Sequence, residues 1–326
     1  MNKLLLSLVL SITVVVSGDI ILKASHQWPG GGKDVRDQMV QILADEVEKA
    51  NVGLKIKIYP SKSLYKPKEQ WAAVTKGRLD ITAFPLDYAG GRHPEFSATL
   101  MPGLIKNHDH ATRVNDSEFM MDIKKIINKA GARVLSDSWL AGGFVSKNKC
   151  ILNPEDIKGQ VTRAAGKNFE NMLIGAGASI SSMSSSEIYT ALQTGVLDAA
   201  NTSSGSFVSY RIYEQVKCLT APGKHALWFM YEPILISNKT WNKLNQAQQD
   251  ALTMAGQKAE DFFIKEAKNL DDKMVSAYKK AGVKVVYMTE NQANKWKKIA
   301  EETSYKMFEE RVATGKELIR KARMVE

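Results

Sequence analysis

The sequence predicts an α/β protein with a parallel sheet and enough chain for two lobes. Strand and helix patterns alternate at its start, over residues 20–25 (strand), 33–49 (helix), 54–59 (strand), 67–76 (helix) and 81–84 (strand). This order calls for a parallel sheet with right-handed crossovers. An α/β pattern returns between about 142 and 228, and 326 residues are enough for two separate cores.

Glycine and proline residues mark where several of these early elements end. Trp28-Pro-Gly-Gly-Gly32 follows the first strand and is too glycine-rich to continue it. Pro60 stops the second strand, and Gly77-Arg-Leu-Asp80 returns the chain to the third. The helix over 33–49 is indicated by apolar residues at helical spacing, namely Val35, Met39, Ile42, Leu43 and Val47.

The second half of the sequence predicts two connections between the lobes and one very long helix. Residues 132–140 read as one strand that leaves the first lobe, and 233–237 read as a return strand. Residues 244–282 are helical throughout, a stretch too long for one small domain to cover. A strand over 283–287 and a mostly helical segment over 289–325 complete the chain.

Residues 1–18 have the pattern of a secretory signal peptide. Lys3 precedes an apolar run from Leu4 to Val16, and Val16-Ser17-Gly18 offers small residues for cleavage. The run is shorter than the roughly 20 residues that span a bilayer. We therefore expect export to the periplasm without membrane insertion. The net charge of +10 is spread along the chain, and export argues against a nucleic-acid partner.

The motifs of common enzymes and metal sites are absent from the sequence. There is no G-x-S-x-G, H-E-x-x-H, G-x-x-x-x-G-K or C-x-x-C pattern. His108-Asp-His110 is interpreted as a solvated loop because no further ligand lies nearby. We therefore predict no catalytic residue, no bound metal and no cofactor. Cys150 and Cys218 form a disulfide in an oxidising compartment or stay as two buried thiols, and two cysteines alone do not decide.

Three motifs follow one another between residues 152 and 217. They are Asn153-Pro-Glu-Asp-Ile-Lys-Gly159 before a short strand with Arg163, Glu187-Ile-Tyr-Thr-Ala-Leu-Gln-Thr-Gly-Val-Leu-Asp198 followed by Asn201, and Tyr213-Glu-Gln-Val-Lys217. In this order they resemble the DctP-type solute-binding proteins of TRAP (tripartite ATP-independent periplasmic) transporters. The resemblance extends over nearly the whole mature chain.

The resemblance implies a two-lobe fold like that of periplasmic binding proteins, with the long helix running along both lobes. The first lobe would comprise residues 19–139 and 233–273, and the second 140–232 and 274–326. An organic acid would bind between them and be delivered to a membrane permease without chemical change. Two other functions stay open, presentation of the ligand to a sensor kinase and periplasmic turnover of a carboxylic acid.

The resemblance also assigns ligand contacts. Arg163 falls at the position of the arginine that holds the ligand's carboxylate, for which a guanidinium offers two parallel donors. Asn201 matches an asparagine that hydrogen-bonds the ligand, and Gln27 is a polar side chain at the end of the first strand. Val145 stands where the family often carries a second arginine. One anchor suits one carboxylate, with a sulfonate as the nearest alternative.

Aromatic side chains are candidates for the rest of the pocket. Tyr88, Trp139, Trp228 and Phe229 lie near the ends of predicted strands, where they either border the ligand or fill the core. Ser185 stands where relatives often have an aromatic residue, which predicts a roomier pocket. Together these residues predict a monocarboxylate with an apolar, even aromatic, body.

Two further features leave alternatives open. Gly30-Gly31-Gly32 lies before the first helix, where free N–H groups hold an anion or where the turn simply needs glycine dihedrals. Glu232 either pairs with a basic group or competes with an anionic ligand, and the sequence does not show its direction.

Overall fold

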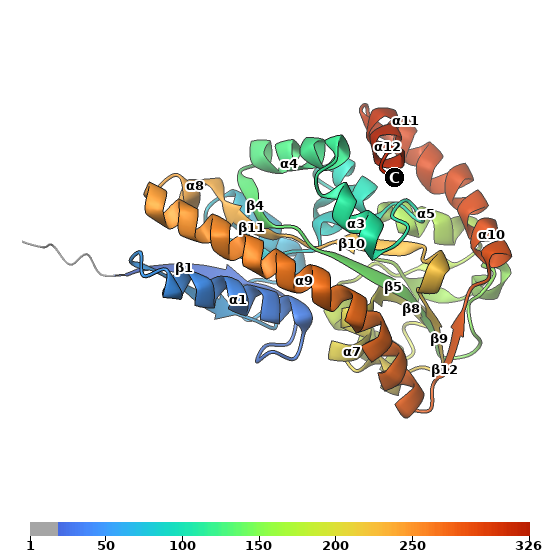
Figure 1. The fold of residues 1–326 in the computed structure, drawn as a ribbon. Helices are drawn as coiled ribbons and strands as arrows, with labels where there is room; N and C mark the ends of the chain where they lie inside the picture. Colours follow the sequence, from blue (N-terminus) through green and yellow to red (C-terminus); the bar gives the residue numbers. More distant parts are fainter. Residues whose placement is uncertain (1–18) are drawn as a thin grey trace, which may run out of the picture.

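Two sheets form two lobes, bridged by one long helix. The structure is a computed structural model that describes residues 19–326, so the predicted signal peptide lies outside the described residues. One sheet has five strands and the other seven. Figure 1 shows the lobes side by side, with helix α9 running diagonally across both. The predicted two-lobe α/β fold with its long helix is confirmed.

The first lobe is built on the five-stranded sheet, in the order β2-β1-β3-β11-β4. β1, β2 and β3 are parallel, and β11 is antiparallel to both neighbours. The strands are β1 Ile20–Ser25, β2 Leu54–Tyr59, β3 Ile81–Ala83, β4 Ala132–Ser136 and β11 Ile234–Ser237. The crossovers are α1 (Val35–Lys49) and the short pair η1 (Pro67–Glu69) and α2 (Gln70–Thr75). The predicted strand–helix–strand–helix–strand order is therefore confirmed.

The second lobe is built on the seven-stranded sheet, in the order β12-β9-β5-β8-β6-β7 with β10 paired to β5. Its strands are β5 Trp139–Ser146, β6 Val161–Arg163, β7 Ser179–Ile180, β8 Ala199–Ser203, β9 Cys218–Ala221, β10 Trp228–Tyr231 and β12 Lys284–Tyr287. Its short helices are α5 Lys167–Gly175, α6 Ile188–Gln193 and α7 Ser204–Ser209. The sequence analysis missed β10 because four consecutive apolar residues carry no period.

The predicted crossing strand over 132–140 is two strands, not one. β4 ends in the first sheet at Ser136, and β5 begins in the second sheet at Trp139. The return crossing lies between β10 and β11, at Glu232 and Pro233. The crossings bond to each other, since the Ser138 hydroxyl donates to the Glu232 carbonyl and the Glu232 amide donates to the Ser138 carbonyl. A hinge between the lobes would lie at these paired crossings.

Helix α9 (Gln246–Lys280) is 35 residues long and confirms the predicted helical stretch. The Asn245 side chain accepts from the amide of Gln248, and Gln248 bonds back to the amide of Asn245, a capping box that begins the helix. α9 packs on α1 in the first lobe and on α7 in the second. A Cβ on Gly256 would lie 2.1 Å from the Leu135 carbonyl, so glycine allows α9 to approach β4 closely. The predicted division of α9 between lobes at 273/274 stays a prediction.

Further helices and helical turns complete the two lobes. They are η2 Leu86–Ala89, η3 Pro94–Leu100, α3 His108–Val114, α4 Glu118–Ala130 and α8 Asn238–Trp241. The predicted helical segment 289–325 is divided into α10 Glu290–Ala300, a π-helical turn Glu301–Tyr305, α11 Lys306–Arg311 and α12 Gly315–Arg323. α12 packs against α4, so the end of the segment predicted for the second lobe contacts the first lobe.

The two cysteines form a disulfide, which decides between the alternatives that the sequence left open. Cys150 follows β5 and Cys218 begins β9, 68 residues later. Their Cα atoms are 5.2 Å apart, a usual separation for a disulfide. The bond fastens the loop after β5 to the neighbouring strand of the second lobe.

Removing this disulfide is expected to lower the free energy of unfolding by about 4 kcal/mol, because a long loop is released in the unfolded chain. Urea unfolding of the double variant Cys150→Ser/Cys218→Ser measures the loss, with reduced wild type as the control. Two titratable thiols in native, unreduced protein would contradict the disulfide itself.

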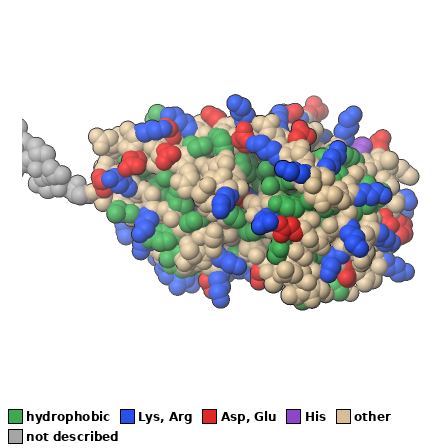
Figure 2. All heavy atoms as spheres, turned by 90° about the horizontal axis from the view of Figure 1, so that it is seen from below, with side chains coloured by type: hydrophobic (Ala, Val, Ile, Leu, Met, Phe, Trp, Pro, Cys, Tyr) green, Lys and Arg blue, Asp and Glu red, His purple; other side chains and the backbone are tan. Residues whose placement is uncertain are grey.

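The surface carries its positive charge in dispersed form. Figure 2 shows Lys and Arg side chains scattered over one face, with Asp and Glu between them. Among residues 19–326, no helix combines the length and apolar character that a bilayer crossing requires.

Candidate ligand-binding site

Arg163 lies at the carboxyl end of β6 and is 1% exposed. Its Nε donates to the Met183 carbonyl at 3.0 Å, its Nη1 to the Asn201 carbonyl at 2.8 Å and its Nη2 to the Tyr88 hydroxyl at 3.0 Å. Met183 and Asn201 belong to the second lobe, whereas Tyr88 follows β3 in the first. Arg163 is therefore held where the two lobes meet.

Two N–H groups of the Arg163 guanidinium have no acceptor among residues 19–326. The guanidinium has five N–H groups, and the contacts above use three of them. Within the described chain, one N–H remains on each terminal nitrogen. One donor on each nitrogen matches the two oxygens of a single carboxylate in a bidentate pair.

Two buried amide side chains at the lobe interface lack protein partners within residues 19–326. Within residues 19–326, neither the oxygen nor the nitrogen of the Gln27 and Asn201 side chains has a hydrogen-bond partner, and both residues are buried. Gln27 follows β1, and its carbonyl accepts from the Tyr210 hydroxyl of the second lobe at 3.0 Å. Buried polar groups without partners are costly. These amides are therefore suited to donate to and accept from an enclosed solute.

Tyr88 of the first lobe bonds to two residues of the second lobe. Its hydroxyl accepts from Arg163 Nη2 and, at 2.9 Å, from the backbone amide of Ser185. Ser185 therefore contributes its backbone amide here, and the aromatic side chain beside it is Tyr88 of the first lobe. The structure thus brings together four predicted site residues, Arg163, Asn201, Tyr88 and Ser185.

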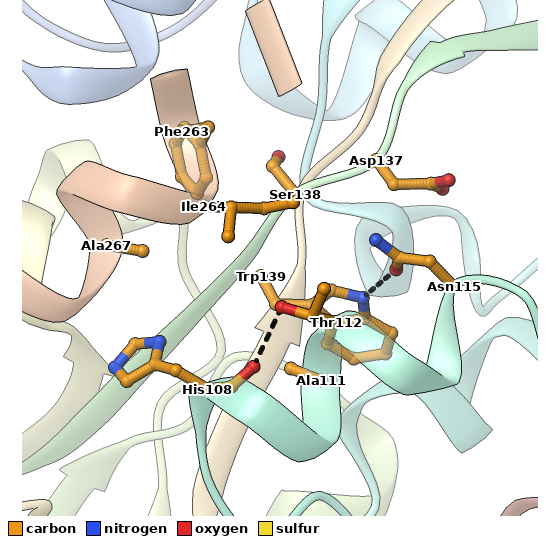
Figure 3. Close-up of a pocket in the computed structure, with 10 residues that line it drawn as sticks. All are labelled: His108, Ala111, Thr112, Asn115, Asp137, Ser138, Trp139, Phe263, Ile264 and Ala267. Atoms are coloured by element: carbon orange, nitrogen blue, oxygen red, sulfur yellow. Dashed lines mark hydrogen bonds between the residues drawn. The ribbon is translucent and has the colours of Figure 1, made fainter. Parts of the chain in front are cut away.

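Trp139 and Phe229 are placed elsewhere. The Trp139 indole donates to Asn115 Oδ1 at 2.8 Å and lines a small cavity under α3 and α9, shown in Figure 3. Its volume of about 10 Å³ suits a single water. The Phe229 ring meets the His108 ring edge-on at 5.3 Å. Among the described residues, no hydrogen bond or ring contact joins either side chain to Arg163.

Trp228 lies on the opposite face of β10 from Phe229, because successive strand residues alternate. It pairs with Gly142 on β5, which pairs in turn with Ser203 on β8, two residues after Asn201. A Cβ on Gly142 would lie 2.5 Å from the Trp228 ring, so glycine makes room for it. The buried Trp228 Nε1 has no hydrogen-bond partner within residues 19–326. Of the four predicted rings, Tyr88 bonds to Arg163, and Trp228 lies on the face of the second sheet that carries the Asn201 side chain.

A second buried arginine, Arg36 on α1, joins the lobes. Its donors reach Asp34 at 2.8 and 2.7 Å and Glu232 at 3.0 Å. They also reach two serines of the second lobe, Ser203 at 3.1 Å and Ser206 at 3.2 Å. All five N–H groups of Arg36 therefore have protein acceptors, and none is left for a ligand. Glu232 points to a basic group, which decides the alternative that the sequence left open.

The opposite charges of Arg36, Asp34 and Glu232 offset part of the cost of burying each of them. Burial alone would lower the pKa of Arg36, but the Asp34 and Glu232 carboxylates raise it above its ordinary value. Burial also raises the pKa of Glu232, opposed by the positive charges of Arg36 and Arg163. Both guanidiniums thus act on the same carboxylate, so a bound anion would meet a nearly balanced set of charges.

A groove lies between the two lobes. Its volume is about 430 Å³, and it is lined by Lys62, Lys66, Lys68 and Glu69 of the first lobe and by Met183 and Glu187 of the second. The Met183 carbonyl accepts from Arg163. Three lysines against two glutamates leave this groove positive, which attracts anions.

The glycine loop before α1 is explained by its backbone. Gly31 and Gly32 have φ of 71° and 72°, in the left-handed region that favours glycine. The Gly32 amide already donates to Asp37 Oδ2 at 2.8 Å. The need for glycine dihedrals is therefore confirmed, and this N–H is not free for an anion.

The interpretation of His108-Asp-His110 as a solvated loop is wrong, because these residues begin helix α3. His110 is buried and accepts from the Lys106 amide, and His108 pairs with Asp271 of α9 at 2.9 Å. Across residues 19–326, no group of three or more His, Cys, Asp or Glu side chains is placed to hold a metal ion.

Sequence reasoning missed Arg36 and Asp87. Asp34 accepts from the Arg36 amide as the N-cap of α1, and charged residues in a first helical turn usually face solvent. Local sequence thus gave no sign that Arg36 is buried. The sequence does indicate Asp87 as a candidate, because it lies just beyond β3 and the carboxyl ends of parallel strands are where ligands bind. The same signal selected its neighbour Tyr88.

Comparison with known proteins identifies the family of this chain. The family model for DctP, a bacterial extracellular solute-binding protein of family 7, matches residues 25–311. A solute-binding protein of Albidiferax ferrireducens is 40% identical over 291 residues, covering 88% of this chain and 86% of the relative. The sialic acid-binding periplasmic protein SiaP of Vibrio cholerae is 30% identical over 291 residues, covering 88% and 89%.

A solved structure extends the likeness to three dimensions. A TRAP periplasmic solute-binding protein from Rhodoferax ferrireducens, with bound malonate, superimposes with a TM-score of 0.90 at 38% identity, covering 93% of this chain and 98% of that one. The chain therefore belongs to family 7 of the bacterial extracellular solute-binding proteins, the DctP family of TRAP transporters.

Proposed function

We propose that this protein captures an organic acid between its lobes in the periplasm and delivers it to a TRAP membrane permease. The observation that carries the proposal is the pair of N–H groups left on Arg163, one on each terminal nitrogen. The buried amides of Gln27 and Asn201 flank the same interface and lack protein partners among residues 19–326. A carboxylate with polar neighbours supplies the missing bonds.

The delivery step rests on family membership and on the predicted export signal at residues 1–18. Closure follows from the contacts between the lobes, because a ligand favours the closed arrangement only through interactions it makes better there. Arg163 meets Tyr88 of the other lobe, so a carboxylate on Arg163 is enclosed as the lobes meet. No chemical change of the ligand is part of this proposal.

The finer proposal is a monocarboxylate with an apolar body. Val145 stands where the family often carries a second arginine, and the five donors of Arg36 are all bonded to protein acceptors. A second carboxylate would then be buried without a positive partner, which is costly. The Trp228 and Tyr88 rings offer apolar surface for the rest of the ligand.

The relative with bound malonate gives the competing ligand class, since malonate has two carboxylates. Calorimetry on wild type decides between phenylacetate, as a monocarboxylate with an aromatic body, and malonate, succinate and malate. We expect phenylacetate to bind more tightly than any of the three dicarboxylates, and benzenesulfonate tests the sulfonate alternative. Tighter binding of a dicarboxylate would remove the monocarboxylate proposal while leaving the organic-acid proposal in place.

A thermal-shift screen precedes calorimetry. An acid present at 100 times its Kd stabilises the folded protein by about 2.7 kcal/mol. Mass spectrometry of small molecules that co-purify with the protein from the periplasm identifies candidates outside this panel. If no carboxylate or sulfonate shifts unfolding, the proposed function fails.

A further inference from the structure

Asp87 of the first lobe lies against the start of helix α5 in the second lobe. It belongs to η2, next to Tyr88, and is 5% exposed. A Cβ built on Gly166, the N-cap of α5, would lie 1.3 Å from Asp87 Oδ2. Gly166 has no side chain to cap α5. The carboxyl of one lobe thus fills the space where the other lobe lacks a side chain, and the contact exists only while the lobes are together.

The polar atoms around Asp87 are short of donors. Within residues 19–326, four buried atoms here have no hydrogen-bond partner: Asp87 Oδ1 and Oδ2, Ser97 Oγ and Asn168 Oδ1. Asn168 Nδ2 donates to the Ser97 carbonyl at 2.9 Å, which places the two residues together. A Cβ on Gly90 would lie 2.7 Å from Ser97 Oγ and 3.6 Å from Asp87 Oδ1, so one small space borders both oxygens.

An ionised Asp87 makes this shortage worse. A carboxylate and an amide oxygen only accept, and the Ser97 hydroxyl is the one side-chain donor among the four atoms. A proton on Asp87 adds a second donor and removes a buried charge. The start of α5 favours the carboxylate, but such helix-end effects are smaller than the cost of burying an unpaired charge.

Some charged groups around Asp87 raise its pKa and others lower it. Burial raises the pKa of Asp87 from 3.8 to about 7. The Ser97 hydroxyl, which is close to Asp87 but outside hydrogen-bond geometry, opposes this rise. Glu170 on α5 raises the pKa further, and Arg163 and Arg311 lower it. A ligand carboxylate on Arg163 would offset the positive charge that helps Asp87 to ionise. Ligand binding and lobe closure therefore both favour the protonated form of Asp87.

We propose that Asp87 is a proton site coupled to ligand binding, so that closing the lobes around the acid takes up one proton from solvent. This inference rests on the proposed function, because it needs a ligand that closes the lobes. Opening the lobes exposes Asp87 again and releases the proton together with the solute.

The sign of the pH dependence follows from the two states. When the lobes are open, Asp87 is exposed and titrates near the usual value of about 3.9. When they are closed, its pKa is about 7. Between these values closure binds a proton, so affinity falls by up to tenfold for each unit of rising pH. Below about pH 4 the gain in ligand affinity from the proton is fully present, and above about pH 7 the affinity falls no further.

Calorimetry at pH 6 measures the proton directly. Phenylacetate and malonate are titrated into wild type in buffers of different ionisation enthalpy, and the dependence of the binding heat on that enthalpy gives the number of protons taken up. We expect close to one proton for wild type and none for Asp87→Asn, whose affinity should also change little between pH 5 and 7. Asp272→Asn, at an exposed position on α9, should behave as wild type.

The possible outcomes separate the two proposals. No proton uptake by wild type would overturn the proton site. Undiminished uptake by Asp87→Asn would overturn it too, since the proton would then be bound elsewhere, as at Glu232. Asp87→Ala is the second variant should the amide not fold, with circular dichroism as the check. The absence of binding heat from both acids would instead count against the proposed function.

Discussion

Arg163→Ala is expected to weaken binding of the acid by about 2–5 kcal/mol, as for other buried charge pairs that lose one partner. The side chain is buried, and its two remaining N–H groups are matched to a carboxylate. Arg163→Lys keeps the charge but loses the fork of parallel donors, so we expect an intermediate loss. Isothermal titration with the tightest acid of the panel measures both variants.

A matched control distinguishes loss of the anchor from loss of charge. Arg92→Ala removes an arginine from an exposed position of the first lobe and should leave affinity unchanged. Arg163 also bonds to Met183, Asn201 and Tyr88, so the unfolding midpoint of each ligand-free variant is measured as well. A folded Arg163→Ala protein with wild-type affinity would remove Arg163 as the anchor.

Motifs located Arg163 and Asn201 because these residues belong to one continuous stretch whose order is informative. Arg163 ends a short strand after a proline-containing turn, and Asn201 lies in the next strand of the sheet, so local sequence fixes both positions. The resemblance then supplied their roles. The two strands are neighbours in the second sheet, which explains why the Arg163 side chain reaches the Asn201 carbonyl.

Contacts between the lobes were not predictable in the same way. Arg36 is buried by residues 167 and 196 positions later in the chain, Ser203 and Glu232, and no local pattern encodes such partners. Distant partners also explain why the crossing over residues 132–140 was predicted as one strand and is two. Apolar residues stand on both sides of the polar segment Ser136-Asp-Ser138. Ser138 bonds to Glu232 of the other crossing, and the strand is interrupted there.

Aromatic residues show the limit of composition as a guide to a pocket. The sequence left Phe229 open between ligand contact and core, and it favoured Trp139 and Trp228 as pocket residues. The alternation of β10 separates Trp228 from Phe229, and Trp139 bonds to Asn115 beneath α3. Which rings face Arg163 therefore depends on the strand register, which a single sequence with short apolar runs does not specify.

Gly166→Ala is expected to reduce affinity by about 1–3 kcal/mol, the usual cost of overpacking a filled site. The added Cβ would lie 1.3 Å from Asp87 Oδ2 and 2.2 Å from Asp87 Cγ, and buried Asp87 has little room to move away. Opening the lobes relieves the overlap. The variant should therefore fold normally without ligand, because Gly166 has an extended backbone with φ of −161° that alanine adopts readily.

A second substitution tests whether the overlap with Asp87 causes the loss. In the double variant Asp87→Ala/Gly166→Ala, removal of the carboxyl empties the space, so affinity should recover relative to Gly166→Ala alone. Gly91→Ala is the matched control, since a Cβ at that exposed position meets nothing within 4 Å. Calorimetry gives the affinities, and small-angle scattering of the ligand-saturated proteins shows whether Gly166→Ala stays more open than wild type. Wild-type affinity in Gly166→Ala, or no recovery in the double variant, would mean that the lobes do not close through the contact between Asp87 and α5.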